Sequence, residues 1–148
     1  MKDESLTIRT AYMTALNNVV QYNSVGVPLY DQVPSDTSYP YIYFSGFTSM
    51  EDAGADKDRF TKDVTVTLTV CMRFTQNAGS QMPLDNICNQ IENIIRGGQT
   101  ISPGLSFLPD WDNTISAFTG TNFFKEKVAD SVVYYRTLKF RHRIQQLT

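Results

Sequence analysis

Residues 63–74 read Asp-Val-Thr-Val-Thr-Leu-Thr-Val-Cys-Met-Arg-Phe, and apolar side chains occupy every second position of this run. Threonines, one cysteine and one arginine fill the positions between them, with no glycine or proline. A period of two with many β-branched residues predicts a long strand that buries one face. We expect this strand to lie at the centre of the fold, and the other elements are placed relative to it.

A second alternating run, residues 131–145, lies close to the C-terminus. Its apolar side carries Val132, Tyr134, Leu138, Phe140 and Ile144, and its other side carries Tyr135, Thr137, Lys139, Arg141 and Arg143. The pattern predicts a second long strand whose apolar side shares the core of the first. Three consecutive positions of its outer side, Lys139, Arg141 and Arg143, are basic.

Two segments have the spacing of amphipathic helices. Residues 5–22 carry apolar side chains three and four positions apart, with Asp3 or Ser5 as the expected N-terminal cap and Asn23 to Gly26 as the expected end. Residues 84–95 repeat the spacing, begin near Pro83 and stop at Gly97. Each helix is expected to cover the apolar face of the sheet.

The remaining segments predict a small sheet with long connections. Residues 27–30 are expected to be a short extended edge piece, 31–40 a loop, 40–47 a strand rich in aromatic residues and 48–62 a polar loop. In residues 99–130 we expect short strands joined by turns, with 118–124 as one arm of a hairpin whose other arm is the last strand. The predicted fold class is α+β, an antiparallel β-sheet packed on one face by two α-helices, in a single domain of residues 1–148 with 99–130 as an inserted hairpin region.

Length and composition agree with one ordinary domain. The chain has 148 residues, a formal net charge of −2 and 19% charged residues, so there is no global attraction to nucleic acid. No apolar run approaches the length of a membrane span, and the N-terminus lacks a secretion signal, which predicts a soluble protein made in a cytoplasm. Two isolated cysteines, Cys71 and Cys88, are expected to be free and buried, with a disulfide as the alternative.

Residues that could carry catalysis are few. The single histidine, His142, falls on the apolar side of the last strand, where we expect it to close the end of the core. No nucleophile elbow, metal-ligand spacing or phosphate-binding loop accompanies it. The sequence therefore predicts a protein that is not an enzyme and that holds no cofactor or metal.

Charge is distributed unevenly along the chain. Acidic residues gather in the polar loop, where Glu51, Asp52, Asp56 and Asp58 lie beside Arg59. The basic row Lys139, Arg141 and Arg143 is expected to meet solvent, an acidic neighbour or nucleic acid. This separation of charge would suit head-to-tail contacts between copies of the chain, so these eight residues are the candidate interface.

Several short sequence segments resemble those of the tail-completion or tail-terminator family of long-tailed bacteriophages and the related joining proteins of viral necks. The matching segments are Val27-Pro28-Leu29-Tyr30-Asp31-Gln32-Val33-Pro34 and Tyr39-Pro40-Tyr41-Ile42-Tyr43-Phe44. A variable loop, the strand from Asp63 and the helix of 84–95 follow in the same order as in the family. The similarity covers about residues 6–98, and the long segment 99–130 departs from the family pattern.

The resemblance implies a structural virion protein of the neck or tail, assembled in the host cytoplasm. It implies a homo-hexamer or homo-dodecamer ring that ends the tail tube or joins it to the head connector around the DNA channel. Its expected partners are other copies of itself, the portal or connector and the tail-tube proteins, with non-specific contact to passing DNA and no membrane. Two alternatives are a monomeric α+β nucleic-acid-binding module that uses the basic C-terminal strand and a small-molecule enzyme or ligand-binding domain.

Overall fold

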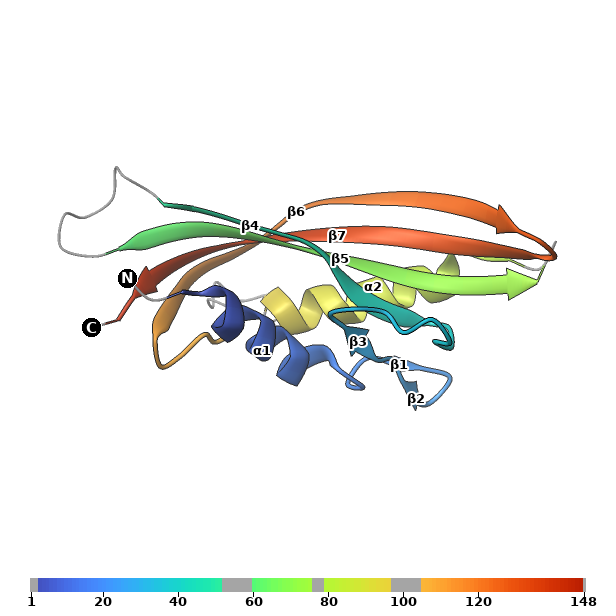
Figure 1. Ribbon diagram of the computed structural model, residues 1–148, viewed down its shortest axis with the longest axis horizontal. Coiled ribbons are helices and arrows are strands. Elements are labelled where there is room, and N and C mark those ends of the chain that lie inside the picture. The colour runs from blue at the N-terminus through green and yellow to red at the C-terminus, as the bar shows by residue number, and fades with distance from the viewer. Residues whose placement is uncertain (1–2, 52–59, 76–78, 97–104, 148) are drawn as a thin grey trace.

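A five-stranded sheet with two helices on one of its faces forms the body of the protein (Figure 1). The computed structural model describes residues 3–51, 60–75, 79–96 and 105–147. In the sheet the order is β3-β4-β5-β7-β6, with β3 parallel to β4 and all other neighbours antiparallel. The strands span Leu29–Tyr30 (β3), Tyr41–Glu51 (β4), Thr61–Thr75 (β5), Trp111–Val128 (β6) and Ser131–Gln146 (β7), and the helices span Ser5–Leu16 (α1) and Met82–Arg96 (α2). The predicted α+β class with two helices on one face is confirmed.

The alternating run that predicted a long central strand forms β5. It pairs with β4 on one side and with β7 on the other. Its apolar residues Val64, Val66, Leu68, Val70 and Met72 are all buried on the side that faces the helices. Pairing on both edges and burial of one whole face make β5 the best-protected strand among the described residues.

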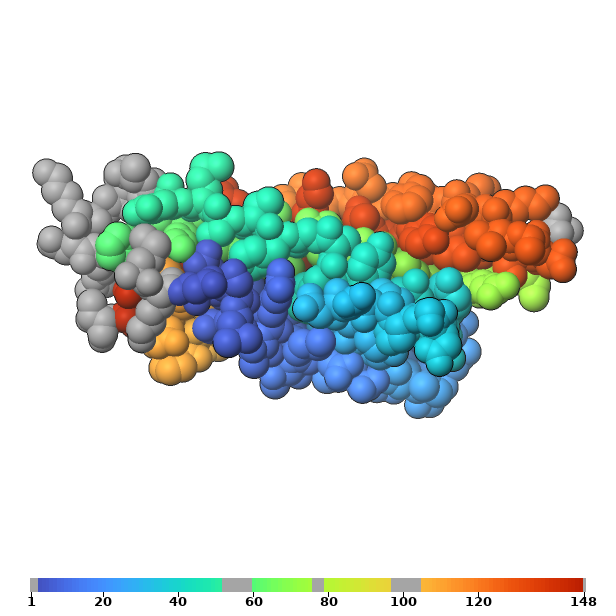
Figure 2. Space-filling model, viewed as in Figure 1, coloured from blue at the N-terminus to red at the C-terminus, as the bar shows by residue number. Residues whose placement is uncertain are grey.

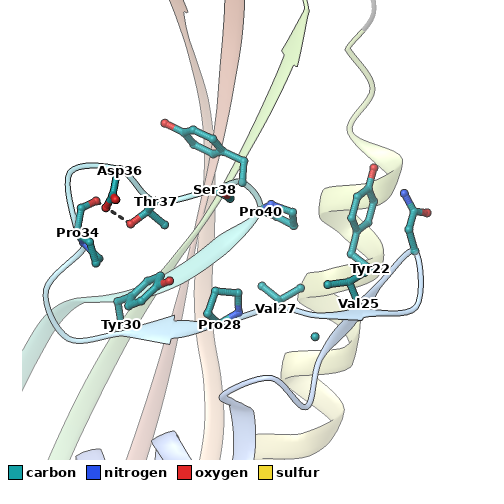
Figure 3. A pocket seen from close by; sticks show the side chains of 13 residues that line it. Tyr22, Val25, Val27, Pro28, Tyr30, Pro34, Asp36, Thr37, Ser38 and Pro40 are labelled. Atoms are coloured by element: carbon teal, nitrogen blue, oxygen red, sulfur yellow. Dashed lines mark hydrogen bonds between the residues drawn. The ribbon is translucent and has the colours of Figure 1, made fainter.

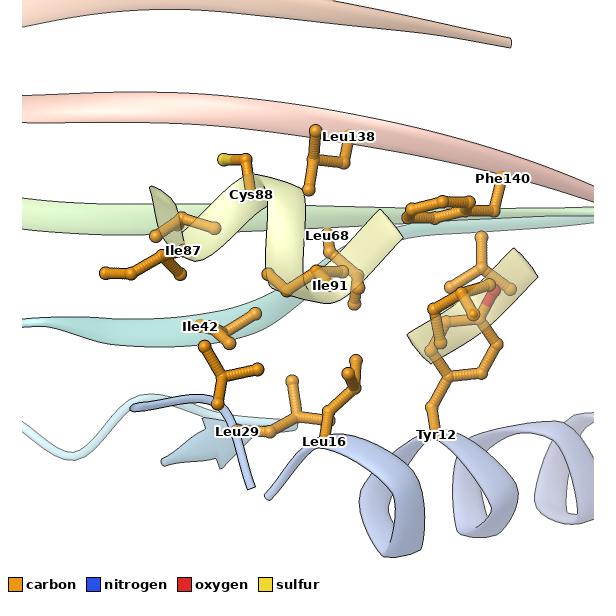
Figure 4. Close-up of a cluster of buried hydrophobic side chains, with 14 of the residues drawn as sticks. Tyr12, Leu16, Leu29, Ile42, Leu68, Ile87, Cys88, Ile91, Leu138 and Phe140 are labelled. Atoms are coloured by element: carbon orange, nitrogen blue, oxygen red, sulfur yellow. The ribbon is translucent and has the colours of Figure 1, made fainter. Parts of the chain in front are cut away.

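The two helices supply the opposite wall of the core. Figure 4 shows Tyr12 and Leu16 of α1, and Ile87 and Ile91 of α2, pointing toward Leu68 and its neighbours on the sheet. Each fully buried Leu or Ile contributes roughly 1.5–3 kcal/mol to stability relative to an exposed one. The core is thus a single layer of apolar side chains between helices and sheet.

Helix α1 ends at Leu16, six residues before the predicted end, so the expected helix of 5–22 is too long. Asn17 leaves the helix with extended backbone and Asn18 has a left-handed φ of 60°, which no continuing helix tolerates. The Asn17 Oδ1 accepts the amide of Leu29 at 3.0 Å, and the amide of Asn18 donates to the carbonyl of Val27. These tertiary bonds replace the last turn that the apolar spacing predicted.

A small hairpin follows in place of the predicted last turn of that helix. It consists of β1 (Gln21–Tyr22) and β2 (Val25–Gly26), joined by Asn23 and Ser24 with φ of 50° and 64°. Two successive positive φ values are the mark of a tight hairpin turn that matches strand twist. Of the extended edge piece predicted for 27–30, Leu29–Tyr30 form β3, which pairs with β4.

The predicted polar loop of 48–62 is shorter than expected, because both flanking strands continue into it. Thr48 to Glu51 belong to β4, and Ser49, Met50 and Glu51 pair with Val64, Asp63 and Lys62 of β5. The polar side chains of this stretch obscured its strand character. Residues 52–59 lie outside the part of the chain that the structure describes.

The region 111–128 forms one long strand, and the expected short strands joined by turns are wrong there. Strand β6 pairs with β7 along its whole length and accommodates two irregularities, at Asn113/Ile115 and Phe118/Gly120. Each bulge shifts the side-chain alternation by one, which hid the period of two from the sequence pattern. The predicted hairpin between residues 118–124 and the last strand is confirmed.

The far half of this hairpin extends past the helices (Figure 1). Every residue of β6 from Thr121 to Val128 is exposed. We call Thr121–Val128, together with the β7 residues that pair with it, the hairpin arm. Figure 2 shows its orange and red surface at the end of the molecule away from α1.

Candidate assembly surface

The face of the sheet opposite the helices is uncovered and carries a tyrosine cluster. Tyr41 lies at its centre, with ring centroids 6.2 Å from Tyr30, 5.1 Å from Tyr39 and 6.2 Å from Tyr43. The register places Tyr41 opposite Cys71, and Cys71 opposite Tyr135. The cluster therefore crosses four strands, β3, β4, β5 and β7, on one side of the sheet.

An aromatic stack extends this cluster onto the edge strand. Phe124 of β6 stacks on Tyr135 of β7 with centroids 4.8 Å apart and an interplanar angle of 14°. Half of the Phe124 residue surface is exposed. Tyrosine and phenylalanine on an open surface are typical of protein interfaces, since their large rings bury much area at low entropic cost.

Three titratable groups of this surface, Cys71, Tyr41 and Tyr135, have a raised pKa and stay protonated near neutral pH. Burial raises the pKa of the Cys71 thiol to about 11 and that of the Tyr135 hydroxyl to about 12, and it also raises the pKa of Tyr41. A thiol with such a pKa is a poor nucleophile at pH 7. Cys71 and Cys88 are free and buried, as predicted, and burial raises the pKa of Cys88 to about 12.

The basic row lies on the same uncovered face. Lys139 and Arg141 are exposed and Arg143 is half-buried. Arg141 contacts Asp63 of the neighbouring strand, with 3.0 Å between its Nη2 and the carboxylate Oδ2. An acidic neighbour, one of the three environments expected for this row, is thus present for Arg141, in an exposed pair of small energetic value.

The predicted interface also included acidic residues, of which the structure describes only Glu51. Glu51 does not lie beside the basic row. Glu51 is exposed at the end of β4 and is paired in register with Lys62, whose side chain points to the helix side. Residues Asp52, Asp56, Asp58 and Arg59 lie outside the described residues. Within the described chain, Glu51 and the basic row therefore lie on opposite faces of the sheet.

His142 is buried, and both of its ring nitrogens are hydrogen-bonded. Its Nε2 lies 2.5 Å from the Tyr12 hydroxyl, its Nδ1 lies 2.9 Å from the Ser116 hydroxyl, and the Phe107 ring packs against it edge-on. Burial lowers the pKa of His142 to about 4, so the ring is neutral at pH 7. The expectation that His142 closes the end of the core is confirmed, and its contacts give it a structural role.

Other chemical features are sparse in the described part of the chain. No group of three or more His, Cys, Asp or Glu side chains there could hold a metal ion. None of the described helices is both long and apolar enough to cross a membrane.

One hollow lies beside β3 and the loop that follows it (Figure 3). It has a volume of about 520 Å³ and is lined by Tyr22, Tyr30 and Tyr39 together with Pro28, Pro34 and Pro40. Figure 3 shows a hydrogen bond between Thr37 and Pro34, where the Thr37 hydroxyl donates to the Pro34 carbonyl at 2.6 Å. The hollow adjoins the tyrosine cluster through Tyr30 and Tyr39.

Two grooves flank the outer side of α1. One, of about 490 Å³, lies between α1 and residues 105–109; the other, of about 470 Å³, lies between α1, Asp31 and Phe44. Helix α1 contains one charged residue, Arg9, and its outward positions include Thr7, Thr10 and Thr14. A surface helix normally carries many charges on its outer side, so the outer side of α1 is unusually poor in charge.

Comparison with known proteins identifies a similar fold. No family model matches the chain, and no curated protein matches it. A solved structure described as "Virion of native gene transfer agent (GTA) particle" contains a chain with a TM-score of 0.59 and 15% sequence identity. The match covers 79% of this chain and 78% of that chain. At this level of identity the likeness shows a shared fold.

The sequence pattern predicted the hairpin of residues 118–124 with the last strand but not the full length of β6, and it gave no prediction of the grooves beside α1. The two bulges of β6 hid its full length. For the grooves a signal was present, because α1 has threonines where a solvent-facing helix would have charged residues. The tyrosines of the cluster were visible as a group, but their position on the uncovered face follows from the register of β4.

Proposed function

We propose that this chain is a structural protein of a phage-like virion and that it works by assembling with copies of itself. The fold shared with a chain of a gene transfer agent virion particle, over more than three quarters of both chains, is the observation that carries the proposal. Assembly requires surfaces that are complementary and partly apolar. The tyrosine cluster, the hairpin arm and the grooves beside α1 supply such surfaces.

In the finer proposal the protein is a tail terminator or neck ring. Copies of the chain form a closed ring of six or twelve that ends the tail tube, or joins it to the portal or connector, around the channel through which DNA passes. The ring is assembled in the host cytoplasm and becomes part of the virion. The resemblance of residues 6–98 to the tail-completion family supports this position, and the molecule acts through shape without catalysis.

Size-exclusion chromatography with light scattering tests the assembly. We expect a discrete species of six or twelve subunits and, by electron microscopy, rings with a central opening. A monomer at the highest soluble concentration, together with a virion that joins heads to tails when the gene is deleted, would contradict the proposal.

A second candidate function is nucleic-acid binding, which the placement of Lys139, Arg141 and Arg143 on an uncovered face favours. If the row binds phosphates, the affinity for duplex DNA falls steeply with salt, and replacing all three residues by glutamine reduces that salt dependence. Under the assembly proposal the same triple variant keeps its ring. Comparing DNA affinity with subunit number therefore separates the two functions.

A further inference from the structure

One long edge of the sheet is only partly covered. Strand β3 pairs with β4 at Ile42 and Tyr43 alone, and the adjacent edge of β4 from Phe44 to Glu51 has no strand beside it among the described residues. Native proteins protect such edges or pair them, since unpaired backbone groups attract another strand. The side chains along this part of β4 include no lysine or proline that would block pairing.

The 470 Å³ groove lies directly beside the point where that free edge begins. Leu6 and Met13 of α1 and Phe44 of β4 supply its apolar lining. Two carboxylates, Asp3 and Asp31, also line it, and the single guanidinium of Arg9 lies 3.9 Å from Asp31. The groove is therefore apolar with a net acidic lining.

The hairpin arm has the complementary properties. Phe123 is 39% exposed, and Lys125 and Lys127 follow it at alternate positions, so these three side chains share one face of β6. Phe124 lies on the other face, where it stacks on Tyr135. Strand β6 is the outer edge of the sheet, so one row of its backbone groups faces outward. One exposed aromatic ring with two cations on the same face of the strand matches an apolar groove bordered by two carboxylates.

We propose that the hairpin arm of one copy docks along the free edge of β4 in a second copy, with Phe123 in the groove beside α1. This inference rests on the proposed assembly function and specifies the interface. The arm lies at the end of the molecule away from α1 (Figure 2), and the groove lies beside α1, so the contact joins unlike surfaces. Such head-to-tail contacts continue from copy to copy and close into a ring when the rotation permits.

Disulfide cross-linking tests the contact in the full chain. The variant that combines Lys125→Cys with Asp31→Cys should form a ladder of multimers under mild oxidation, because each copy would link to two neighbours. The native thiols are buried, and burial raises the pKa of Cys71 to about 11, so they do not compete. Each single variant should form no multimer larger than a dimer. The matched pair Lys139→Cys with Asp31→Cys should likewise form no ladder of multimers.

A charge exchange provides the second measurement. Replacing Lys125 and Lys127 by glutamate should raise the concentration needed for half-association at least about tenfold, with the monomer's melting temperature unchanged. Replacing Asp3 and Asp31 by lysine should weaken it similarly, and combining the four changes should restore it. Lys139→Glu, the matched control, should have no effect.

The outcomes separate this contact from the broader proposal. If the wild-type chain forms rings while the cysteine pair gives no ladder and the charge variants associate normally, the docking contact is wrong and the assembly function stands. If the wild-type chain stays monomeric at every concentration, both are wrong.

Discussion

His142 illustrates how a residue that could suggest catalysis is used for structure. Both of its ring nitrogens meet hydroxyl groups, of Tyr12 and Ser116, inside the core. Buried polar atoms are tolerated when they are hydrogen-bonded. Here each nitrogen of the neutral ring has a hydroxyl group as its hydrogen-bond partner. Its charge state therefore bears on stability.

We predict that acidification destabilises the fold through this histidine. The unfolded chain takes up a proton near the usual pKa of 6.5, whereas burial lowers the folded pKa to about 4. The contribution is complete above pH 6.5 and is lost as the pH falls toward 4, by about 3 kcal/mol in all. Urea unfolding of the wild type and of His142→Gln across this pH range measures the contribution. The difference between their free energies of unfolding should shrink with falling pH. A difference that stays constant would contradict a lowered pKa of His142 in the folded protein.

At the scale of elements, hydrogen bonds from outside α1 decide where it ends. Asn17 and Asn18 bond to the chain around Val27 and Leu29, and the β1–β2 hairpin then packs closely on the end of the helix. Gly26 is a point of close approach between the two. A Cβ atom placed there would lie 2.6 Å from the backbone oxygen of Asn18.

We predict that Gly26→Ala destabilises the protein by at least about 1 kcal/mol, because a backbone atom cannot move aside as a flexible side chain can. Gly120→Ala is the matched control, since a Cβ at Gly120 meets no atom within 4 Å. Its effect should lie within about 0.5 kcal/mol of zero. Thermal or urea unfolding of the two variants checks this. Equal effects would show that the short distance between residue 26 and the Asn18 backbone does not restrict the side chain at position 26.

At the scale of the whole molecule, the helices and the core cover one face of the sheet and leave the other open. The open face bears the tyrosine cluster and the basic row, while the hairpin arm projects from one end (Figure 1). A monomer would expose these aromatic groups to water. Their burial between subunits is the physical driving force of the proposed ring.

We predict that the melting temperature rises with protein concentration. A partner that binds the folded chain and not the unfolded one stabilises it by mass action, so dilution below the association range should lower the midpoint. Scanning fluorimetry over a hundredfold dilution series makes the measurement. The variant Phe123→Ser should lose this dependence, with a midpoint no higher than that of the dilute wild type, because Phe123 also packs against Tyr134 within one copy.

Sequence periodicity by itself determined the central elements of this protein. The apolar alternation of β5 and the helical spacing of α2 each reflect burial of one face, and this local geometry repeats regularly enough to be read along the chain. The buried histidine and the free cysteines followed from their positions in those patterns. Only the tertiary structure decided the end of α1, the full length of β6 and the placement of Glu51 away from the basic row. The asparagine bonds, the two bulges and the strand register responsible depend on residues distant in the chain, which no local pattern contains.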